Sequence, residues 1–209
     1  MNTRVLLLAA PRALFLVGLV LPLAGIVRFA GRDAVAVALF VTYLAWLVFE
    51  TRVTFRHDRG VPAESSTLLP YALARLAVLG GAAFGPMPWL GGSGLLAVPV
   101  VVFALGVVGR QAAITTLGRF YSHHVVRRDG HSVVSHGLYR FVRHPAYTGM
   151  LLANLGFTAY FLNPFSVVAL VLLFGAVVRR ILVEERVLWT VPEYPAYATG
   201  RARLLPRVW

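Results

Sequence analysis

The stretch AYTGMLLANLGFTAYFLNPFSVVALVLLFGAVVRRILVEERVL, residues 146–188, contains two long apolar runs separated by Asn163-Pro164. An α-helix needs about 20 apolar residues to cross a hydrocarbon core of roughly 30 Å, and an open strand cannot cross because its backbone groups would stay unpaired. Proline suits the first turn of a helix and biases the residue before it away from helix. The stretch therefore predicts two membrane helices joined in a tight hairpin.

Apolar runs of the same kind occupy most of the remaining chain. The candidate spans are Ala13 to Val27, Ala34 to Phe49, Leu68 to Phe84, Gly94 to Leu117, Ala146 to Leu162 and Phe165 to Leu188. The 209 residues are 58% hydrophobic and only 13% charged, with a mean hydropathy of +0.74, which lies outside the range of soluble domains. The sequence predicts an all-α integral membrane protein of five to six transmembrane helices, ending in a tight helical hairpin and a cytoplasmic C-terminal segment.

We expect a single membrane domain over residues 1–209, because the chain has neither an internal repeat nor a linker long enough to separate two domains. Apolar spans fill residues 1–110, and the polar motifs fall in residues 111–209. The first apolar run follows Arg4 and Arg12 without a small-residue cleavage pattern, so we expect it to remain as a span.

The basic residues are distributed unevenly along the chain. All 20 are arginines, and with six spans and both termini inside, 17 of the 20 fall on inner segments or near span ends there. Arg28 and Arg32 fall outside, and Arg75 lies within the third span. The net charge of +12 therefore belongs to a membrane face rather than to a nucleic-acid site, and we expect any chemistry on the cytoplasmic side.

The absent residue types restrict that chemistry. Without lysine the chain has no Schiff-base nucleophile, and without cysteine it has no thiolate nucleophile, disulfide or Cys-ligated metal. A di-metal site of the membrane hydroxylase kind could be proposed on five of the six histidines, namely His123, His124, His131, His136 and His144. Four of them share one loop rather than projecting from rigid helices, so we expect no metal.

Three polar stretches carry the residues best suited to chemistry. The first is GLYRFVRHPAYTG, residues 137–149, where Arg143 and His144 precede the proline of a helix start. Free N–H groups at such a start, next to an arginine and a histidine, can hold an anion. The alternative is a cationic anchor at the membrane surface.

The second stretch is RRILVEE, residues 179–185, at the end of the last apolar run. Arg180 and Glu184 lie four residues apart and share a helical face, whereas Glu185 points about 100° away. The two carboxylates should therefore have different neighbours. A carboxylate at the membrane boundary is costly unless it is paired or used, so a ligand amine and a local ion pair are both possible partners.

The third stretch is the tail YPAYATGRARLLPRVW, residues 194–209, in which tyrosines and arginines alternate with apolar residues. Such residues also suit the membrane interface by themselves. Arg75 is a separate candidate because a charge deep in a span is functional by default. We expect it to face the bundle interior and to hold a substrate head group or pair with Glu50, unless it snorkels from a tilted helix.

Together the patterns G-x-Y-x-x-x-R-H-P-x-Y-x-G, R-I-x-x-E-E-x-x-L and Y-x-x-Y with R-L-x-P resemble the isoprenylcysteine carboxyl methyltransferase family, which is similar in turn to the phospholipid N-methyltransferases. The resemblance covers roughly Gln111 to Trp209. It implies an S-adenosylmethionine-dependent membrane methyltransferase whose cofactor lies between the final hairpin and the C-terminal segment. A sulfonium methyl is already activated, so such an enzyme needs alignment and a matched charge environment rather than a metal or a covalent intermediate.

The resemblance also implies roles for individual residues. The cofactor-binding candidates are Gly137, Leu138, Tyr139, His144, Pro145, Tyr147, Glu184 and Glu185, one of the two glutamates receiving the cofactor's amino group. The catalytic candidates are Arg143, Arg180 and Glu184, and the substrate-binding candidates are Arg75, Arg180, Arg203 and Tyr197.

The resemblance predicts a lipophilic acceptor that enters from the membrane, with membrane lipids as the other partners and no nucleic acid. An isoprenylcysteine-like carboxylate is the expected acceptor, and a phospholipid amine or a small thiol is the alternative. A non-enzymatic lipid-binding protein would also explain the arginine-rich face. Cofactor binding separates that interpretation from an enzyme.

Overall fold

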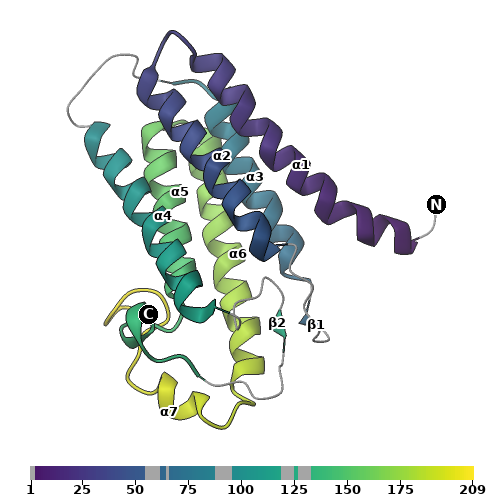
Figure 1. The fold of residues 1–209 in the computed structure, drawn as a ribbon, viewed down its shortest axis with the longest axis vertical. Helices are drawn as coiled ribbons and strands as arrows, with labels where there is room; N and C mark the ends of the chain where they lie inside the picture. Colours follow the sequence, from purple (N-terminus) through teal and green to yellow (C-terminus); the bar gives the residue numbers. More distant parts are fainter. Residues whose placement is uncertain (1–2, 55–61, 65, 88–95, 119–124, 127–132) are drawn as a thin grey trace.

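A computed structural model describes residues 3–54, 62–64, 66–87, 96–118, 125–126 and 133–209 (Figure 1). Its elements are α1 (Thr3–Phe29), α2 (Ala34–Thr54), β1 (Pro62–Glu64), α3 (Leu68–Phe84), α4 (Ala97–Leu117), β2 (Val125–Val126), the 3-10 helix η3 (Gly137–Arg140), α5 (Pro145–Tyr160), α6 (Pro164–Leu188) and α7 (Tyr194–Ala198). Each of the six predicted spans corresponds to one of the helices α1 to α6, so the all-α membrane fold is confirmed.

Strands β1 and β2 were not predicted. They pair antiparallel, with Pro62 opposite Val126 and Glu64 opposite Val125. Both are too short to show an alternating pattern in the sequence. They join two connections at the same end of the helical bundle, below α2 and α3 (Figure 1).

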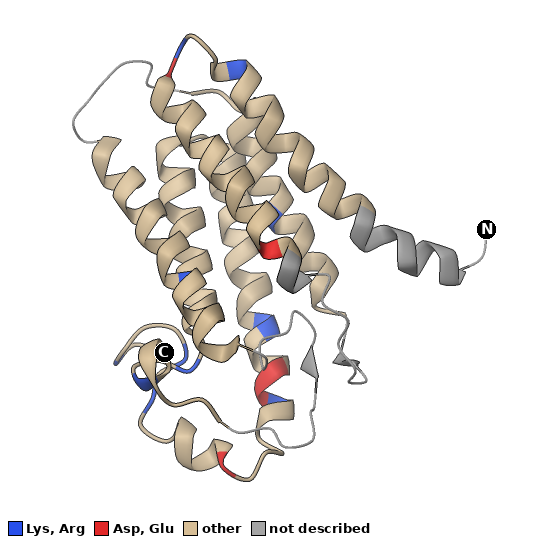
Figure 2. Cartoon of the chain, in the orientation of Figure 1, with Lys and Arg blue, Asp and Glu red and all other residues tan. Residues whose placement is uncertain are grey.

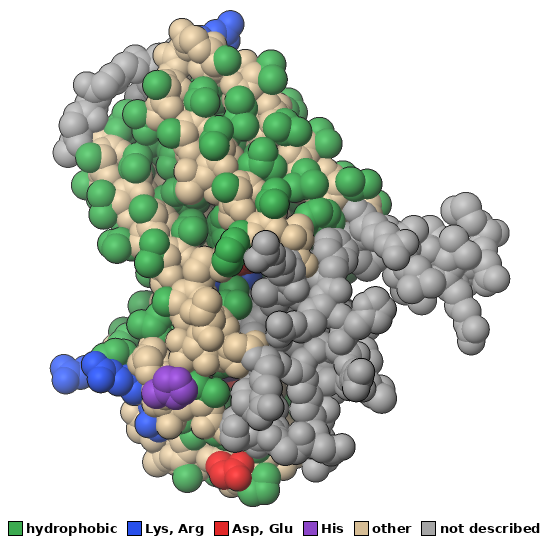
Figure 3. Space-filling view, viewed as in Figure 1, with side chains coloured by type: hydrophobic (Ala, Val, Ile, Leu, Met, Phe, Trp, Pro, Cys, Tyr) green, Lys and Arg blue, Asp and Glu red, His purple; other side chains and the backbone are tan. Residues whose placement is uncertain are grey.

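Among the described residues, three helices are long and apolar enough to cross a membrane. Their spanning stretches are Ala34–Thr51, Ala97–Leu117 and Pro164–Leu188, and Ala13–Phe29 and Leu68–Phe84 are shorter apolar helical stretches. Apolar side chains cover much of the face of the bundle that Figure 3 shows, and many large apolar side chains are exposed. They include Val27, Val108, Phe165 and Val171, each at least 65% exposed. A face of this kind suits lipid rather than water, so the chain is a membrane protein.

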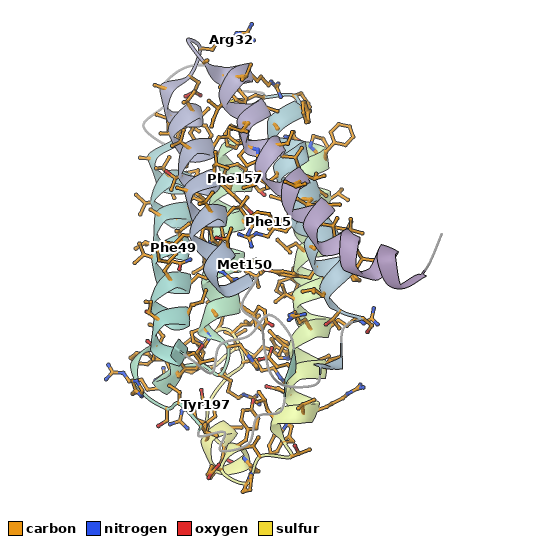
Figure 4. All side chains as sticks on the ribbon, turned by 45° about the vertical axis from the view of Figure 1, so that its right-hand side comes forward. Phe15, Arg32, Phe49, Met150, Phe157 and Tyr197 are labelled. Atoms are coloured by element: carbon orange, nitrogen blue, oxygen red, sulfur yellow. The ribbon has the colours of Figure 1, made fainter. Side chains whose placement is uncertain are left out.

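Aromatic rings form the centre of the bundle. Phe40 of α2 lies 4.8 Å from Phe161 and 5.2 Å from Phe157, centroid to centroid, and Phe157 lies 5.7 Å from Phe103 of α4. Phe157 and Met150, both fully buried, lie between the helices in Figure 4. These tilted and edge-on contacts fix the side-chain packing of α2, α4 and α5 in the interior.

Small residues bring α4 and α5 unusually close together. A Cβ atom at Gly106 would lie 2.2 Å from the backbone nitrogen of Ala153, and one at Gly149 would lie 2.5 Å from that of Arg110. Gly156 approaches Phe103 in the same way. Close backbone contact through small residues is how helices associate in lipid, where the hydrophobic effect gives no preference.

The predicted hairpin between α5 and α6 is confirmed. Asn163 is the N-cap of α6, and its side chain accepts a hydrogen bond of 3.0 Å from the Ser166 backbone nitrogen. Pro164 occupies the first turn. Because α6 has 25 residues and α5 has 16, the last turns of α6 extend to the start of α5 and beyond it, toward the C-terminal segment (Figure 1).

Candidate functional site

The candidate site lies at one end of the bundle, where α5 begins, α6 ends and residues 189–209 fold back beneath them (Figure 1). We call this the site end. Arg28 and Arg32 lie at the opposite end, where Arg28 Nη1 donates to the Ala83 carbonyl over 2.7 Å (Figures 2 and 4). The acidic residues of α6 and the arginines of the C-terminal segment gather at the site end (Figure 2).

The start of α5 is held by the tail. His144 is the N-cap residue and Pro145 begins the helix, as predicted. The backbone N–H of Arg143 donates to the Ala202 carbonyl over 2.9 Å, and that of His144 donates to the Arg203 carbonyl over 3.0 Å. These two N–H groups, at the residues just before the first helical position, are therefore bonded to the tail.

Glu185 is the centre of a buried charge cluster. Its carboxylate is 3% exposed and accepts from Arg143 Nη1 at 2.9 Å and from Arg203 Nε at 2.8 Å. His144 Nε2 lies 3.2 Å from the same carboxylate, and the Tyr194 hydroxyl lies 3.5 Å from it. A buried carboxylate is stable only when its oxygens are paired in this way. The cluster joins α5, α6 and the tail.

Glu184 has different neighbours, as the helical spacing predicted. The Tyr147 hydroxyl donates to Glu184 Oε2 over 2.8 Å and accepts from Arg180 Nε over 2.7 Å. Tyr147 therefore connects an arginine and a glutamate that lie one turn apart on α6. Arg180 is 3% exposed and also donates from Nη1 to Thr67 at 3.2 Å, whereas Glu184 is partly exposed.

The tail tyrosines pack into a small cluster under η3. Tyr139 of η3 is buried together with Tyr194 and Tyr197, and the Tyr197 hydroxyl donates to the Tyr139 carbonyl over 3.0 Å. Burial raises the pKa of Tyr194 well above its ordinary range and raises the pKa of Tyr197 to about 12. Both phenols therefore stay protonated near neutral pH. The Tyr197 hydroxyl thus connects the tail to the loop before α5.

The other two candidates from the glycine-tyrosine motif lie beside this cluster. Gly137 has a φ of 61°, and a Cβ atom there would lie 3.2 Å from the Thr116 side chain. A glycine suits this position because L side chains avoid the left-handed region. Leu138 packs against the cluster that contains Tyr139. These residues shape the loop before α5.

A second charged cluster lies deeper in the bundle. Glu50 of α2 accepts from Arg75 Nη1 of α3 at 3.2 Å and from the guanidinium of Arg110 on α4. Arg75 thus faces the interior and pairs with Glu50, one of the two arrangements expected for it. Arg110 is 1% exposed inside α4 and also donates to the Ala146 carbonyl at 3.1 Å. That bond connects the deep cluster to the first turn of α5.

The sequence interpretation missed several residues that complete these clusters. They are Thr67, Tyr71 and Arg110. Arg110 carried a usable signal because it lies inside an apolar run, as Arg75 does. Thr67 and Tyr71 carried none, because only the packing of α3 against α6 brings them to Arg180.

The described residues contain no group of three or more histidine, aspartate or glutamate side chains that could hold a metal. Of the five histidines considered for a di-metal site, His123, His124 and His131 lie outside the described residues. The His144 ring contacts the Glu185 carboxylate, and His136 is the residue before η3.

Comparison with known proteins finds a family to which this part of the chain is similar. Residues 97–190 match the model of the isoprenylcysteine carboxyl methyltransferase (ICMT) family. The chain is similar to that family over this region. The region contains both glutamates of α6 and the start of α5, and the family implies a methyl donor. Glu50, Arg75 and Arg203 lie outside the matched region.

Individual relatives agree with the family assignment. The chain is 39% identical over 92 residues to a "Probable protein-S-isoprenylcysteine O-methyltransferase" of Oryza sativa subsp. indica, covering 42% of this chain and 48% of the rice protein. It is 35% identical over 99 residues to "Protein-S-isoprenylcysteine O-methyltransferase A" of Arabidopsis thaliana, covering 46% of each. For the Homo sapiens protein-S-isoprenylcysteine O-methyltransferase the values are 37% over 78 residues, 36% of this chain and 26% of the human protein. The chain thus matches about half the length of the two plant relatives.

Proposed function

We propose that this ICMT-family protein is an S-adenosylmethionine-dependent membrane methyltransferase that methylates the carboxylate of an isoprenylcysteine-like lipophilic acceptor. The observation that carries the proposal is the pairing at the site end. Two adjacent glutamates of α6 have separate partners, Glu185 in the arginine cluster and Glu184 with Tyr147 and Arg180. This juxtaposition lies within the region that matches the family.

The residues present fit the cofactor. S-adenosylmethionine carries an ammonium group and a carboxylate, so its site needs a carboxylate and a cationic donor. Glu184 is partly exposed, and Tyr147 is its only hydrogen-bond donor among the described residues, which makes it the better partner for the ammonium. The Nε atom of Arg143 is buried and has no hydrogen-bond partner among the described residues, so it can donate to the cofactor's carboxylate.

The remaining site residues fulfil structural and electrostatic tasks in this proposal. Glu185 holds Arg143 and Arg203 in place, and His144 and Pro145 begin the helix that carries Tyr147. When bound, S-adenosylmethionine supplies a methyl group already activated by its positively charged sulfur. A carboxylate acceptor has no proton to lose on methylation, so the site needs no general base. Its task is to exclude water and orient the acceptor oxygen.

Arg180 is the proposed contact for the acceptor at this site. Its guanidinium is buried and fixed by Tyr147 and Thr67, so it presents a fixed positive charge near Glu184. A fixed guanidinium suits a planar carboxylate. The apolar outer surface of the bundle supports an acceptor that arrives from the lipid (Figure 3).

We further propose that the site end faces the cytoplasm. The arginines of the C-terminal segment lie at this end, and among the residues that the structure describes Arg28 and Arg32 are the arginines at the opposite end (Figure 2). An excess of arginine near span ends favours retention on the cytoplasmic side.

Calorimetric titration of S-adenosylmethionine into detergent-purified protein tests the cofactor assignment. Glu184→Gln should weaken binding strongly, and Glu185→Gln should weaken it too by releasing Arg143 and Arg203. Glu193→Gln is the matched control, because Glu193 is exposed in the turn before α7. Methyl transfer from labelled cofactor to a prenylcysteine analogue tests the reaction. Unchanged affinity in both α6 variants would remove the ammonium contact, and no binding by folded wild type would favour a lipid-binding protein instead.

A further inference from the structure

Two buried polar groups on α3 have no hydrogen-bond partner among the described residues. They are the hydroxyl of Tyr71 and the Nη2 atom of Arg75. Tyr71 is 6% exposed and Arg75 is 8% exposed. Nearly all buried polar groups in proteins are paired, and within a membrane there is no bulk water to pair them. Two such groups on one helix therefore indicate a missing ligand.

The two groups lie on the same face of α3. Residues four apart on a helix are neighbours one turn from each other, so Tyr71 and Arg75 project to the same side. The other nitrogens of Arg75 are occupied, since Nε donates to Tyr43 at 3.1 Å and Nη1 donates to Glu50 at 3.2 Å. The Arg75 guanidinium also stacks 4.3 Å from the Trp46 ring. Its orientation is thus fixed, and Nη2 is left as a donor.

Tyr71 also contacts the candidate site. The guanidinium carbon of Arg180 lies 5.8 Å from the centre of the Tyr71 ring. Arg180 in turn donates to Tyr147, which donates to Glu184. The Tyr71–Arg75 face is therefore separated from the cofactor-binding glutamate of our proposal by Arg180 and Tyr147. A ligand on this face would lie between the deep charged cluster and the site end.

The chemistry of the unpaired atoms selects the ligand. Guanidinium nitrogen can only donate, and a phenol can donate as well, so the ligand must provide an accepting oxygen. Arg75 and Arg180 are both cationic, which disfavours an amine head group and favours an anionic oxygen. A carboxylate matches the guanidinium and can take a further bond from a hydroxyl.

We propose that Tyr71 and Arg75 form a subsite for the carboxylate of the lipophilic acceptor, facing Arg180. This inference rests on the proposed function, because it assumes a lipophilic acceptor that is methylated on a carboxylate. It assigns specificity for a carboxylate over an amine to residues that lie outside the region matched to the family. Arg180 then contributes from the opposite side, on α6.

Binding of a matched pair of ligands tests the subsite without requiring turnover. The probes are an S-prenylated mercaptocarboxylic acid, which is a thioether with a free carboxylate, and its uncharged carboxamide, each titrated into wild type in detergent without cofactor. We expect wild type to prefer the acid, and Tyr71→Phe to weaken binding of the acid by roughly tenfold while hardly changing that of the amide. Arg75→Lys, which removes Nη2, should reduce the same preference.

Tyr71→Phe is informative because its hydroxyl has no described partner in the protein. A purely structural role therefore predicts no change in ligand binding, and the thermal midpoint should stay unchanged or rise. Thr158→Val is the matched control, since Thr158 Oγ1 is another buried hydroxyl without a described partner, on the part of α5 nearer the hairpin. It should leave acid binding unchanged.

The outcomes separate this inference from the proposed function. Equal preference for acid over amide in wild type and Tyr71→Phe would overturn the subsite, as would equally strong displacement of the acid by an anionic phospholipid. Preferential acid binding that depends on Tyr71, without any methyl transfer from S-adenosylmethionine, would support the subsite and contradict the proposed function.

Discussion

Arg203 Nε donates to Glu185 Oε2 over 2.8 Å and thereby attaches the C-terminal segment to the end of α6. The tail also forms a parallel bridge between Ala202 and Val142, next to the start of α5. Thr148 of α5 adds a third link by donating to the Leu204 carbonyl over 2.9 Å. The site is thus closed from below by a segment outside the family-matched region.

Replacing Arg203 should loosen this closure. In Arg203→Gln the Glu185 carboxylate loses one of two arginine partners, and we expect a loss of roughly 2 kcal/mol in stability, the order expected for a hydrogen bond to a charged group. Because the Arg203 side chain is 27% exposed, solvent screening makes this an upper value. Limited proteolysis should cut the tail faster than in wild type. Arg207→Gln is the control, since Arg207 is exposed, and equal cleavage of both variants would contradict the role of Arg203.

Tyr147 should matter for activity more than for stability. Tyr147→Phe removes the hydroxyl that connects Arg180 to Glu184 and leaves the ring in place. We expect methyl transfer to fall by about tenfold or more, in keeping with the loss of bonds to charged groups. Tyr160→Phe provides the control, because Tyr160 bonds to Asp33 at the opposite end of the bundle. A similar loss in both variants, measured with labelled cofactor, would point to general destabilisation.

The contact between α4 and α5 should tolerate no side chain at Gly106. In Gly106→Ala the new Cβ atom would lie 2.2 Å from the Ala153 nitrogen, so the helices must separate. Overpacking of this kind costs about 1–3 kcal/mol, and we expect a lower thermal midpoint in detergent. A Cβ atom at Gly109, one turn away, would meet nothing within 4 Å. Gly109→Ala should therefore be close to neutral, and equal midpoints for the two variants would refute the close contact.

Membrane orientation can be measured because the chain has no cysteine. Single cysteines at Arg32 and Glu193 mark the two ends of the bundle. In intact cells a membrane-impermeant thiol reagent should label Arg32→Cys and spare Glu193→Cys, because we propose that the site end is cytoplasmic. Inverted vesicles should give the opposite pattern. Labelling of Glu193→Cys in intact cells would contradict the proposed orientation.

Alkaline pH should destabilise the buried cluster of Tyr139, Tyr194 and Tyr197, because Tyr197 ionises. Burial raises the pKa of Tyr197 to about 12, above about 10 for an unfolded tyrosine, so the folded state favours the protonated phenol. Its contribution to stability is therefore full below pH 10 and is lost as the pH rises through 12. The thermal midpoint of wild type should fall over that interval. Tyr197→Phe should show a smaller fall, and identical pH curves would show that this phenol does not titrate on unfolding.

The sequence by itself determined the helices and their local signals. Long apolar runs have few alternatives in a membrane, because only helices satisfy their own backbone groups there. Asn163-Pro164 predicted the hairpin, and Pro145 predicted the start of α5, because proline has the same local effect in any fold. The spacing of Arg180, Glu184 and Glu185 predicted that the two carboxylates would have different neighbours, because helical periodicity is also local.

Only the tertiary structure decided which charges meet. Arg110 pairs with Glu50 across 60 residues of sequence, and Tyr71 reaches Arg180 because α3 packs against α6. The backbone N–H groups of Arg143 and His144, just before the first turn of α5, bond to the tail, which no local pattern indicated. A charge buried in low dielectric takes whichever partner the packing brings within hydrogen-bond distance. Pairing between distant segments therefore depends on the approach of whole helices, which periodicity and motif spacing do not contain.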